Sequence, residues 1–321
     1  MAQYQNMQPD LDQIRLGLFE VVCRDYEINN DFALRLRNLE GYEIVVICDD
    51  SGSMNTPVTS PGSNAFSKLP TRWDELKNTV GIIVDIAAIM DHDGIDVYFL
   101  NRPPLLHITH HSQLDGSFNM KASGGTPIVP VLRSILQTKC EKKRLIILAT
   151  DGCPNDEGGR DGITVFREVL ANERGPFDFV TIVACTDEDA AIDYLNDWDK
   201  QIPHLDVVDD YHSERDEIID VQGPRFKFSF GDYVVKALMG SIDPWFDSLD
   251  EVCITGYTTT PVPVVETYIS TPAFVPTPQP MIPLTPPPAY VNVDPAAPPY
   301  VAGGQYKSKK HHKKKKHCTI V

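Results

Sequence analysis

Apolar residues follow two alternating patterns along the chain. Short runs rich in valine, isoleucine and leucine are separated by longer segments whose apolar residues recur at helical spacing. Several of the short runs are apolar throughout, as strands covered on both faces are. They predict strands at residues 43–48, 95–99, 105–109, 145–149, 179–184 and 205–208. Strands that alternate with helices are typical of an α/β fold with a doubly wound, mostly parallel sheet flanked by helices.

The longer segments predict the helices. Residues 74–90 carry a broad apolar face, and Pro127 stands where the first turn of a helix tolerates proline, just before residues 131–137. Further helices are predicted at residues 162–171, 188–197, 214–221 and 232–242. The crossover helices therefore alternate with the strands over most of the chain.

The first forty residues predict short helices. Two sets of apolar residues each share one helical face: Leu11, Ile14, Leu18 and Val21, and then Phe32, Leu36 and Leu39. We expect both faces to pack onto the main domain.

Composition divides the chain into four parts. Thirteen of the 26 prolines lie between Pro261 and Pro299, where charges are few and periodicity is weak. Such a stretch buries too little surface to offset its ordering entropy, which predicts disorder. We expect an N-terminal helical extension at 1–40, an α/β domain at 41–253, a disordered proline-rich linker at 254–305 and a polybasic tip at 306–321.

Charge and cysteine usage narrow the classes of function. The net charge is −16, yet residues 306–321 hold seven lysines and no acidic residue, so the remaining 305 residues carry −23. An acidic body repels phosphate backbones, and we expect no nucleic-acid binding by the folded part. Seven widely spaced cysteines without a CxxC pair predict reduced thiols. With neither a signal peptide nor an apolar run long enough to span a membrane, the sequence predicts a cytoplasmic protein.

One buried strand leads directly into a loop rich in oxygen donors. The segment after Cys48 reads Asp-Asp-Ser-Gly-Ser, a D-x-S-x-S pattern formed by Asp49, Ser51 and Ser53. Loops beyond the carboxyl ends of parallel strands line the ligand crevice of an open sheet. A carboxylate and two hydroxyls are hard donors that suit Mg²⁺ or Mn²⁺.

Two further motifs extend this pattern. Gly124-Gly125-Thr126-Pro127 precedes a predicted helix, and Thr150-Asp151-Gly152 follows another predicted strand. In this order, the three motifs resemble the metal-ion-dependent adhesion site of von Willebrand factor A domains over roughly residues 40–250. The resemblance implies that Asp49, Ser51 and Ser53 of the first loop, Thr126 of the second and Asp151 of the third hold the metal. It also implies a protein partner that presents an acidic side chain to the metal.

Two other interpretations of these residues stay open. Serine, threonine and aspartate also cap helices and build ordinary turns. Alternatively, the site binds metal only to stiffen its loops. The scattered histidines and Cys153 lack the spacing or the neighbouring base of a catalytic set, and no nucleotide-binding loop occurs, so we expect no enzyme activity.

The proline-rich segment contains a short recognition motif. Pro287, Pro288 and Tyr290 match the PPxY pattern, which binds WW domains as a polyproline II segment. A plain linker is the alternative.

The last fifteen residues combine a polybasic run with a C-a-a-X arrangement at Cys318, which resembles the prenylated ends of Ras-like small GTPases. One lipid chain holds a protein only marginally, whereas each lysine near an anionic leaflet adds about 1 kcal/mol. The lysines are Lys307, Lys309, Lys310, Lys313, Lys314, Lys315 and Lys316. Val321 is an unusual last residue for prenylation. The same terminus also suits a PDZ groove, and the basic run alone suits a nuclear-import or polyanion-binding patch.

These patterns together predict a magnesium-dependent binding module tethered to the cytoplasmic face of a membrane. The alternative is a soluble adaptor that recruits WW-domain or PDZ-domain partners such as a ubiquitin ligase.

Overall fold

The computed structural model describes residues 11–58, 69–91, 93–155, 162–186, 192–195 and 198–254. The chain divides into two units, Met1–Val265 and Glu266–Val321. The predicted linker and tip, with Cys318, the PPxY residues and the seven lysines, lie outside the described residues beyond Ile254.

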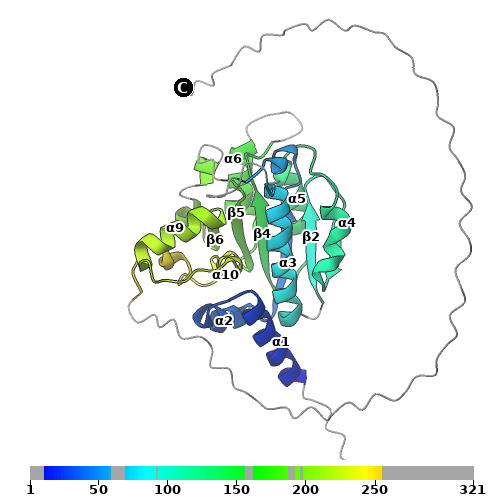
Figure 1. Ribbon diagram of the computed structural model, residues 1–321. Coiled ribbons are helices and arrows are strands. Elements are labelled where there is room, and N and C mark those ends of the chain that lie inside the picture. The colour runs from blue at the N-terminus through cyan, green and yellow to red at the C-terminus, as the bar shows by residue number, and fades with distance from the viewer. Residues whose placement is uncertain are drawn as a thin grey trace, which may run out of the picture. The chain divides into compact units, whose positions relative to one another are not determined.

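The first unit is built on a six-stranded sheet in the order β3-β2-β1-β4-β5-β6 (Figure 1). All neighbouring strands pair in parallel except β3, which runs antiparallel to β2 at one edge. The strands are β1 Tyr42–Cys48, β2 Ile95–Phe99, β3 Leu105–Ile108, β4 Lys143–Thr150, β5 Asp178–Ala184 and β6 Leu205–Val208. The predicted mixed α/β fold with a mostly parallel sheet is confirmed, and each strand lies within two residues of its predicted bounds.

Helices cover both faces of the sheet because the strands are apolar on both faces. In β1, Ile44 and Val46 join one buried cluster, whereas Val45 and Ile47 join the other. The first cluster includes residues of α1 Leu11–Asp25, α2 Asn30–Leu36, α3 Arg72–Met90, α9 Tyr211–Gln222 and α10 Phe230–Met239. The second includes residues of α5 Ile128–Gln137, α6 Gly162–Glu168, the π-helical turn η4 Val169–Glu173 and α8 Trp198–Gln201.

Short turns complete the described elements. They are η1 Arg37–Leu39, η2 Gly52–Asn55, η3 His111–Leu114, α4 Asp115–Phe118, η5 Asp193–Leu195 and η6 Asp247–Leu249. The helix predicted at 188–197 falls partly outside the described residues; of its described part, residues 193–195 form η5.

The N-terminal helices pack differently from one another. The side chains of Phe32 and Leu36 in α2 are fully buried, and the Phe32 ring meets those of Trp245 and Phe246 at 5.3 and 5.2 Å. The prediction for the second apolar face is therefore confirmed. α1 packs beside α3, and α2 packs beside α10 (Figure 1).

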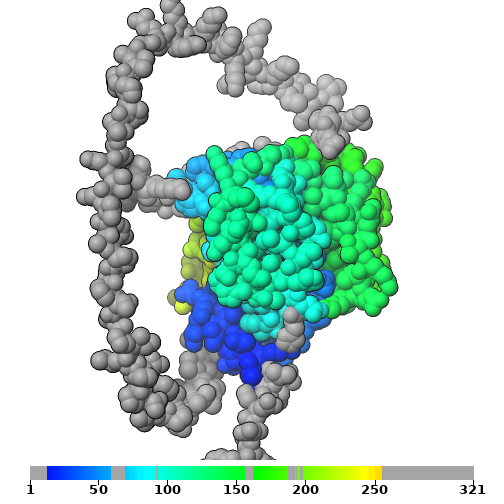
Figure 2. All heavy atoms as spheres, turned by 90° about the vertical axis from the view of Figure 1, so that its right-hand side faces the viewer, coloured from blue at the N-terminus to red at the C-terminus, as the bar shows by residue number. Residues whose placement is uncertain are grey.

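The prediction for the first face was wrong. Ile14, Leu18 and Val21 of α1 are 42%, 52% and 40% exposed, and the side chain of Leu11 lies outside the described residues. The packed face is instead that of Phe19, Val22 and Cys23. Two polar contacts accompany this orientation: the guanidinium of Arg15 donates to the carbonyl of Ile89 at 3.1 Å, and the hydroxyl of Tyr26, which follows α1, donates to Asp85 at 2.5 Å. Figure 2 shows the blue N-terminal helices at the lower edge of one face of the molecule.

No helix among the described residues is long and apolar enough to cross a membrane.

Candidate metal centre

The predicted first and third loops meet at the carboxyl ends of two adjacent strands. β1 pairs with β4 in parallel, with Cys48 opposite Ala149, and the amide of Asp49 donates to the carbonyl of Ala149 at 2.9 Å. The chain runs outward from β1 to β2 and β3, then returns to β4 on the other side of β1. This reversal is the switch point at which open α/β sheets bind their ligands.

Hydrogen bonds fold the first loop around its own carboxylate. Asp49 is fully buried, and its Oδ1 accepts from the amide of Ser51 at 2.9 Å. The next residues form the single turn η2, which brings the hydroxyls of Ser51 and Ser53 to 2.9 Å from one another. The D-x-S-x-S pattern therefore gathers its three side chains within a single tight loop.

The third loop joins this group directly. The hydroxyl of Ser53 donates to Oδ1 of Asp151 at 2.8 Å, and the hydroxyl of Thr150 donates to Oδ2 of Asp49 at 2.7 Å. Ser51, Ser53 and Asp151 thus form a continuous chain of oxygen contacts, with the Asp49 carboxylate bound to both loops.

The second loop is attached through its main chain. Gly52 donates its amide to the carbonyl of Gly124 at 3.2 Å, and Thr126 exchanges hydrogen bonds with Asn155 of the third loop at 2.9 and 3.0 Å. Gly124 has a φ of +115°, and a Cβ there would collide with the Asn101 amide, so only glycine fits. Thr126 itself is buried in this loop, but no described contact joins its hydroxyl to the other four predicted ligands.

Three carboxylates lie within this group of loops, and they differ in their charge partners. Asp151 pairs with Arg72 at 3.0 Å, with both side chains buried, and Asp50 pairs with Arg102 at 2.8 Å. Asp49 has only neutral donors among the described residues. Burial raises the pKa of Asp49 to about 6, although its hydrogen bonds to Thr150 and Ser51 oppose this shift. A buried carboxylate without a counter-charge is costly, and a bound cation would remove that cost.

The donor chemistry fits magnesium. Mg²⁺ prefers oxygen ligands at about 2.0–2.1 Å in an octahedron, which places neighbouring ligand oxygens about 2.9 Å apart. The contacts between Ser51, Ser53 and Asp151 measure 2.9 and 2.8 Å. In the part of the chain that the structure describes, no group of three or more His, Cys, Asp and Glu side chains is arranged to hold a metal. The five predicted ligands are a different kind of group, because three of them, Ser51, Ser53 and Thr126, would bind through hydroxyls.

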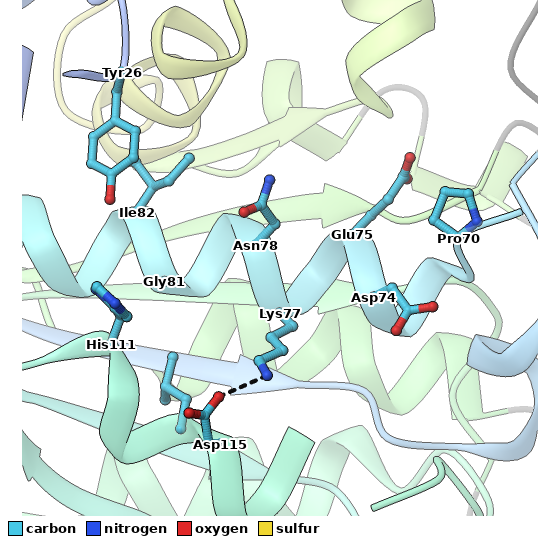
Figure 3. Close-up of a pocket in the computed structure, with 11 residues that line it drawn as sticks. Tyr26, Pro70, Asp74, Glu75, Lys77, Asn78, Gly81, Ile82, His111 and Asp115 are labelled. Atoms are coloured by element: carbon cyan, nitrogen blue, oxygen red, sulfur yellow. Dashed lines mark ion pairs between the residues drawn. The ribbon is translucent and has the colours of Figure 1, made fainter. Parts of the chain in front are cut away.

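Two surface pockets lie away from these loops. One of about 500 Å³ runs along α3, with Tyr26 and His111 near one end and the Lys77–Asp115 ion pair of 2.7 Å on its side (Figure 3). Another, of about 320 Å³, is lined by Glu43, Tyr98 and other residues near the start of β1. None of the five predicted ligands lines either pocket.

Comparisons with known proteins provide no assignment. No family model matches the chain, and no curated protein matches it. Among solved structures, the chain is similar to the PilB minor pilin from Streptococcus sanguinis, with 14% identity, a TM-score of 0.39 and coverage of 64% of each chain. A mutant of that pilin gives 15% identity and a TM-score of 0.41, with 65% of this chain and 62% of the pilin covered. This chain thus spans less than two thirds of the pilin structures, and likeness at this level supports no statement about function.

The residues that support the centre have no recognisable signal in the sequence alone. Thr150 stood inside the third motif, but its bond to Asp49 depends on the pairing of β1 with β4. Arg72 is 79 positions from Asp151 in the sequence, and nothing in its local pattern marks it as a partner. Asn101 and Arg102 follow β2 and hold Asp50, again through contacts that only the sheet order creates.

Proposed function

We propose that the domain is a non-enzymatic protein-binding module that depends on Mg²⁺ or Mn²⁺. The observation that supports this most directly is the fully buried Asp49 carboxylate, which has no cationic partner among the described residues and lies beside the chain of Ser51, Ser53 and Asp151 oxygens. A divalent cation would supply the missing positive charge and a Lewis-acidic point for an incoming oxygen ligand.

The candidate ligands differ in how they are held and in their exposure to solvent. Asp49 and Ser51 are fixed by hydrogen bonds within the first loop, whereas Ser53 is exposed and lies on the solvent side. Thr126, on a loop bonded to the other two, would complete the ligand set as the resemblance to von Willebrand factor A domains implies. An acidic side chain of a protein partner would then reach the metal from the exposed side.

Calorimetric titration with Mn²⁺ tests this proposal. We expect saturable binding by the wild-type protein and none by Asp49→Asn, because the amide lacks the charge that the cation needs. Asp178→Asn is a matched control, since Asp178 is another nearly buried carboxylate but pairs with Arg144 at the start of β4, at the opposite end of the sheet. Absence of Mn²⁺ binding by the folded wild-type protein would contradict the proposal.

We further propose that the polybasic tip and a prenylated Cys318 tether the module to an anionic membrane surface at the cytoplasmic face. The support is the sequence alone: seven lysines directly before a C-a-a-X arrangement. Intact-mass spectrometry of protein from a eukaryotic host, with Cys318→Ser as control, should show a prenyl mass and loss of three residues. An unmodified Val321 terminus would instead favour a soluble, PDZ-binding adaptor.

A second candidate function rests on the PPxY motif. In an adaptor, Pro287, Pro288 and Tyr290 would recruit a WW-domain protein such as a ubiquitin ligase. Tyr290→Ala should abolish capture of a purified WW domain and leave Mn²⁺ binding unchanged. Equal capture of the WW domain by the wild-type protein and by Tyr290→Ala would rule the motif out.

A further inference from the structure

One carboxylate of the candidate centre is held by a buried arginine. Arg72, in the first turn of α3, donates from its guanidinium to Oδ2 of Asp151 at 3.0 Å, and the two side chains are 8% and 0% exposed. The other oxygen of Asp151 accepts from Ser53. The two oxygens of this carboxylate therefore have different partners: Ser53, which is a candidate ligand, and Arg72, which is not.

The chain fixes Arg72 firmly in this position. Its amide donates to the carbonyl of Thr56 at 3.0 Å, and Thr71 caps the helix through a reciprocal pair of bonds with Asp74. A two-residue bridge between Pro57 and Thr71 ties the same turn to the end of the first loop. The helix start, the first loop and the guanidinium thus form one rigid unit beside the metal ligands.

Resting on the proposed metal binding, we propose that Arg72 limits the affinity of the centre for the cation and preserves the cation's charge for an acidic partner. Its positive charge offsets that of Asp151, so Asp49 is the ligand carboxylate left to balance a dication. The bound metal therefore keeps excess positive charge, which attracts a carboxylate from outside. Without Arg72, Asp151 would also balance the metal, which would bind more tightly and attract an external carboxylate less.

Calorimetry with Mn²⁺ alone, followed by Mn²⁺ in the presence of acetate, tests this role. One full charge beside a dication in a partly buried site changes binding by roughly ten- to a hundred-fold, so Arg72→Gln should bind Mn²⁺ more tightly by that factor. Arg72→Lys keeps the charge and should stay within about three-fold of wild type. Acetate should strengthen Mn²⁺ binding by the wild-type protein and do so less in Arg72→Gln, as thermodynamic linkage requires.

The matched control is Arg144→Gln, which breaks the buried pair with Asp178 far from the centre and should leave Mn²⁺ affinity unchanged. If Arg72→Gln does not fold, Asp151→Asn and the double variant Arg72→Gln/Asp151→Asn provide the same comparison with a neutral, hydrogen-bonding pair. The double variant should bind Mn²⁺ more tightly than Asp151→Asn.

The outcomes separate the two proposals. Absence of Mn²⁺ binding by the wild-type protein overturns the metal-binding function. Wild-type binding with equal or weaker affinity in Arg72→Gln, or in the double variant relative to Asp151→Asn, overturns only the role of Arg72.

Discussion

Two clusters of buried carboxylates occupy the first unit, and they balance their charge in opposite ways. In the candidate centre, arginines pair with Asp50 and Asp151, whereas no described arginine pairs with Asp49. The second cluster lies between β6, α9, α10 and η6, where Lys236 is 2% exposed and contacts Glu214 at 2.5 Å and Asp250 at 2.8 Å. The second cluster thus has its own ammonium group, whereas the proposed metal would supply the positive charge beside Asp49.

The second cluster also contains a surplus carboxylate. Asp206 is buried, and its Oδ2 has no hydrogen-bond partner within the described part of the chain. Burial raises its pKa to about 7, against the influence of Lys236. Gly240 packs so closely that a Cβ there would collide with this carboxylate. The backbone of Gly240 thus lies against this carboxylate, whereas Ser53 of the candidate centre is exposed to solvent.

Replacing Lys236 should have the largest effect on the free energy of unfolding. Lys236→Met leaves Glu214 and Asp250 without their ammonium partner, which typically costs about 3–5 kcal/mol when a buried pair is broken. Urea unfolding measures the loss, and Lys227→Met, at an exposed lysine, should stay within about 0.5 kcal/mol of wild type. A loss below about 1 kcal/mol would show that the cluster does not depend on its lysine.

Adding Mg²⁺ should stabilise the protein through the candidate centre and not through the Lys236 cluster. At a Mg²⁺ concentration a hundred times the dissociation constant, a ligand that binds only the folded state adds about 2.7 kcal/mol to the free energy of unfolding. Asp49→Asn should lose this increment entirely. Lys236→Met, although destabilised, should keep it, since its cluster is separate. An equal response of wild type and Asp49→Asn to Mg²⁺ would place the ion elsewhere.

The sequence predicted the fold well because its signals are local. Each strand is a short run dominated by apolar residues, and period and length alone distinguish it from the neighbouring helices. The same locality explains the failure at α1, where Ile14, Leu18 and Val21 form a regular apolar stripe that the helix turns outward. Which of two adjacent apolar faces packs is decided by distant partners, such as the Ile89 carbonyl that holds Arg15.

The sequence points to the candidate ligand residues of the centre but not to the charged residues that pair with its carboxylates. Asp49, Ser51 and Ser53 lie within five residues, so a motif reveals them, and Asp151 follows an evident strand. Their balance of charge depends on Arg72 and Arg102, which reach the centre from other elements. The Lys236 cluster gave no sequence signal, because a lysine in a helix is ordinarily exposed.

Asp206 in the second cluster should also make stability depend on pH. Because the pKa of Asp206 is raised to about 7 by burial, the folded state binds a proton that the unfolded state releases near pH 4. Stability is therefore highest at low pH within this window and falls as pH rises from about 4 to about 7. Unfolding at pH 5 and pH 8 in EDTA should show a smaller fall for Asp206→Asn than for wild type. Glu214, Asp49 and Asp232 shift in the same direction, so only the difference between the two proteins reports on Asp206. Parallel pH profiles would contradict the assignment.

The smallest effect is expected where the Lys236 cluster meets solvent. Asp250 is 24% exposed on its side chain and accepts from the ammonium at 2.8 Å. In Asp250→Asn the amide oxygen can still accept this bond, and Glu214 still supplies a negative charge, so we expect a loss of about 1 kcal/mol, close to the value of an ordinary hydrogen bond. Thermal unfolding with and without Mg²⁺ gives the decisive contrast. The same change of carboxylate to amide at Asp49 should remove the whole response to the metal, whereas at Asp250 that response should be intact. If Asp250→Asn weakened the Mg²⁺ response, the two clusters would be coupled through the sheet. The distinction between a cluster with its own cation and one that binds an external cation would then be wrong.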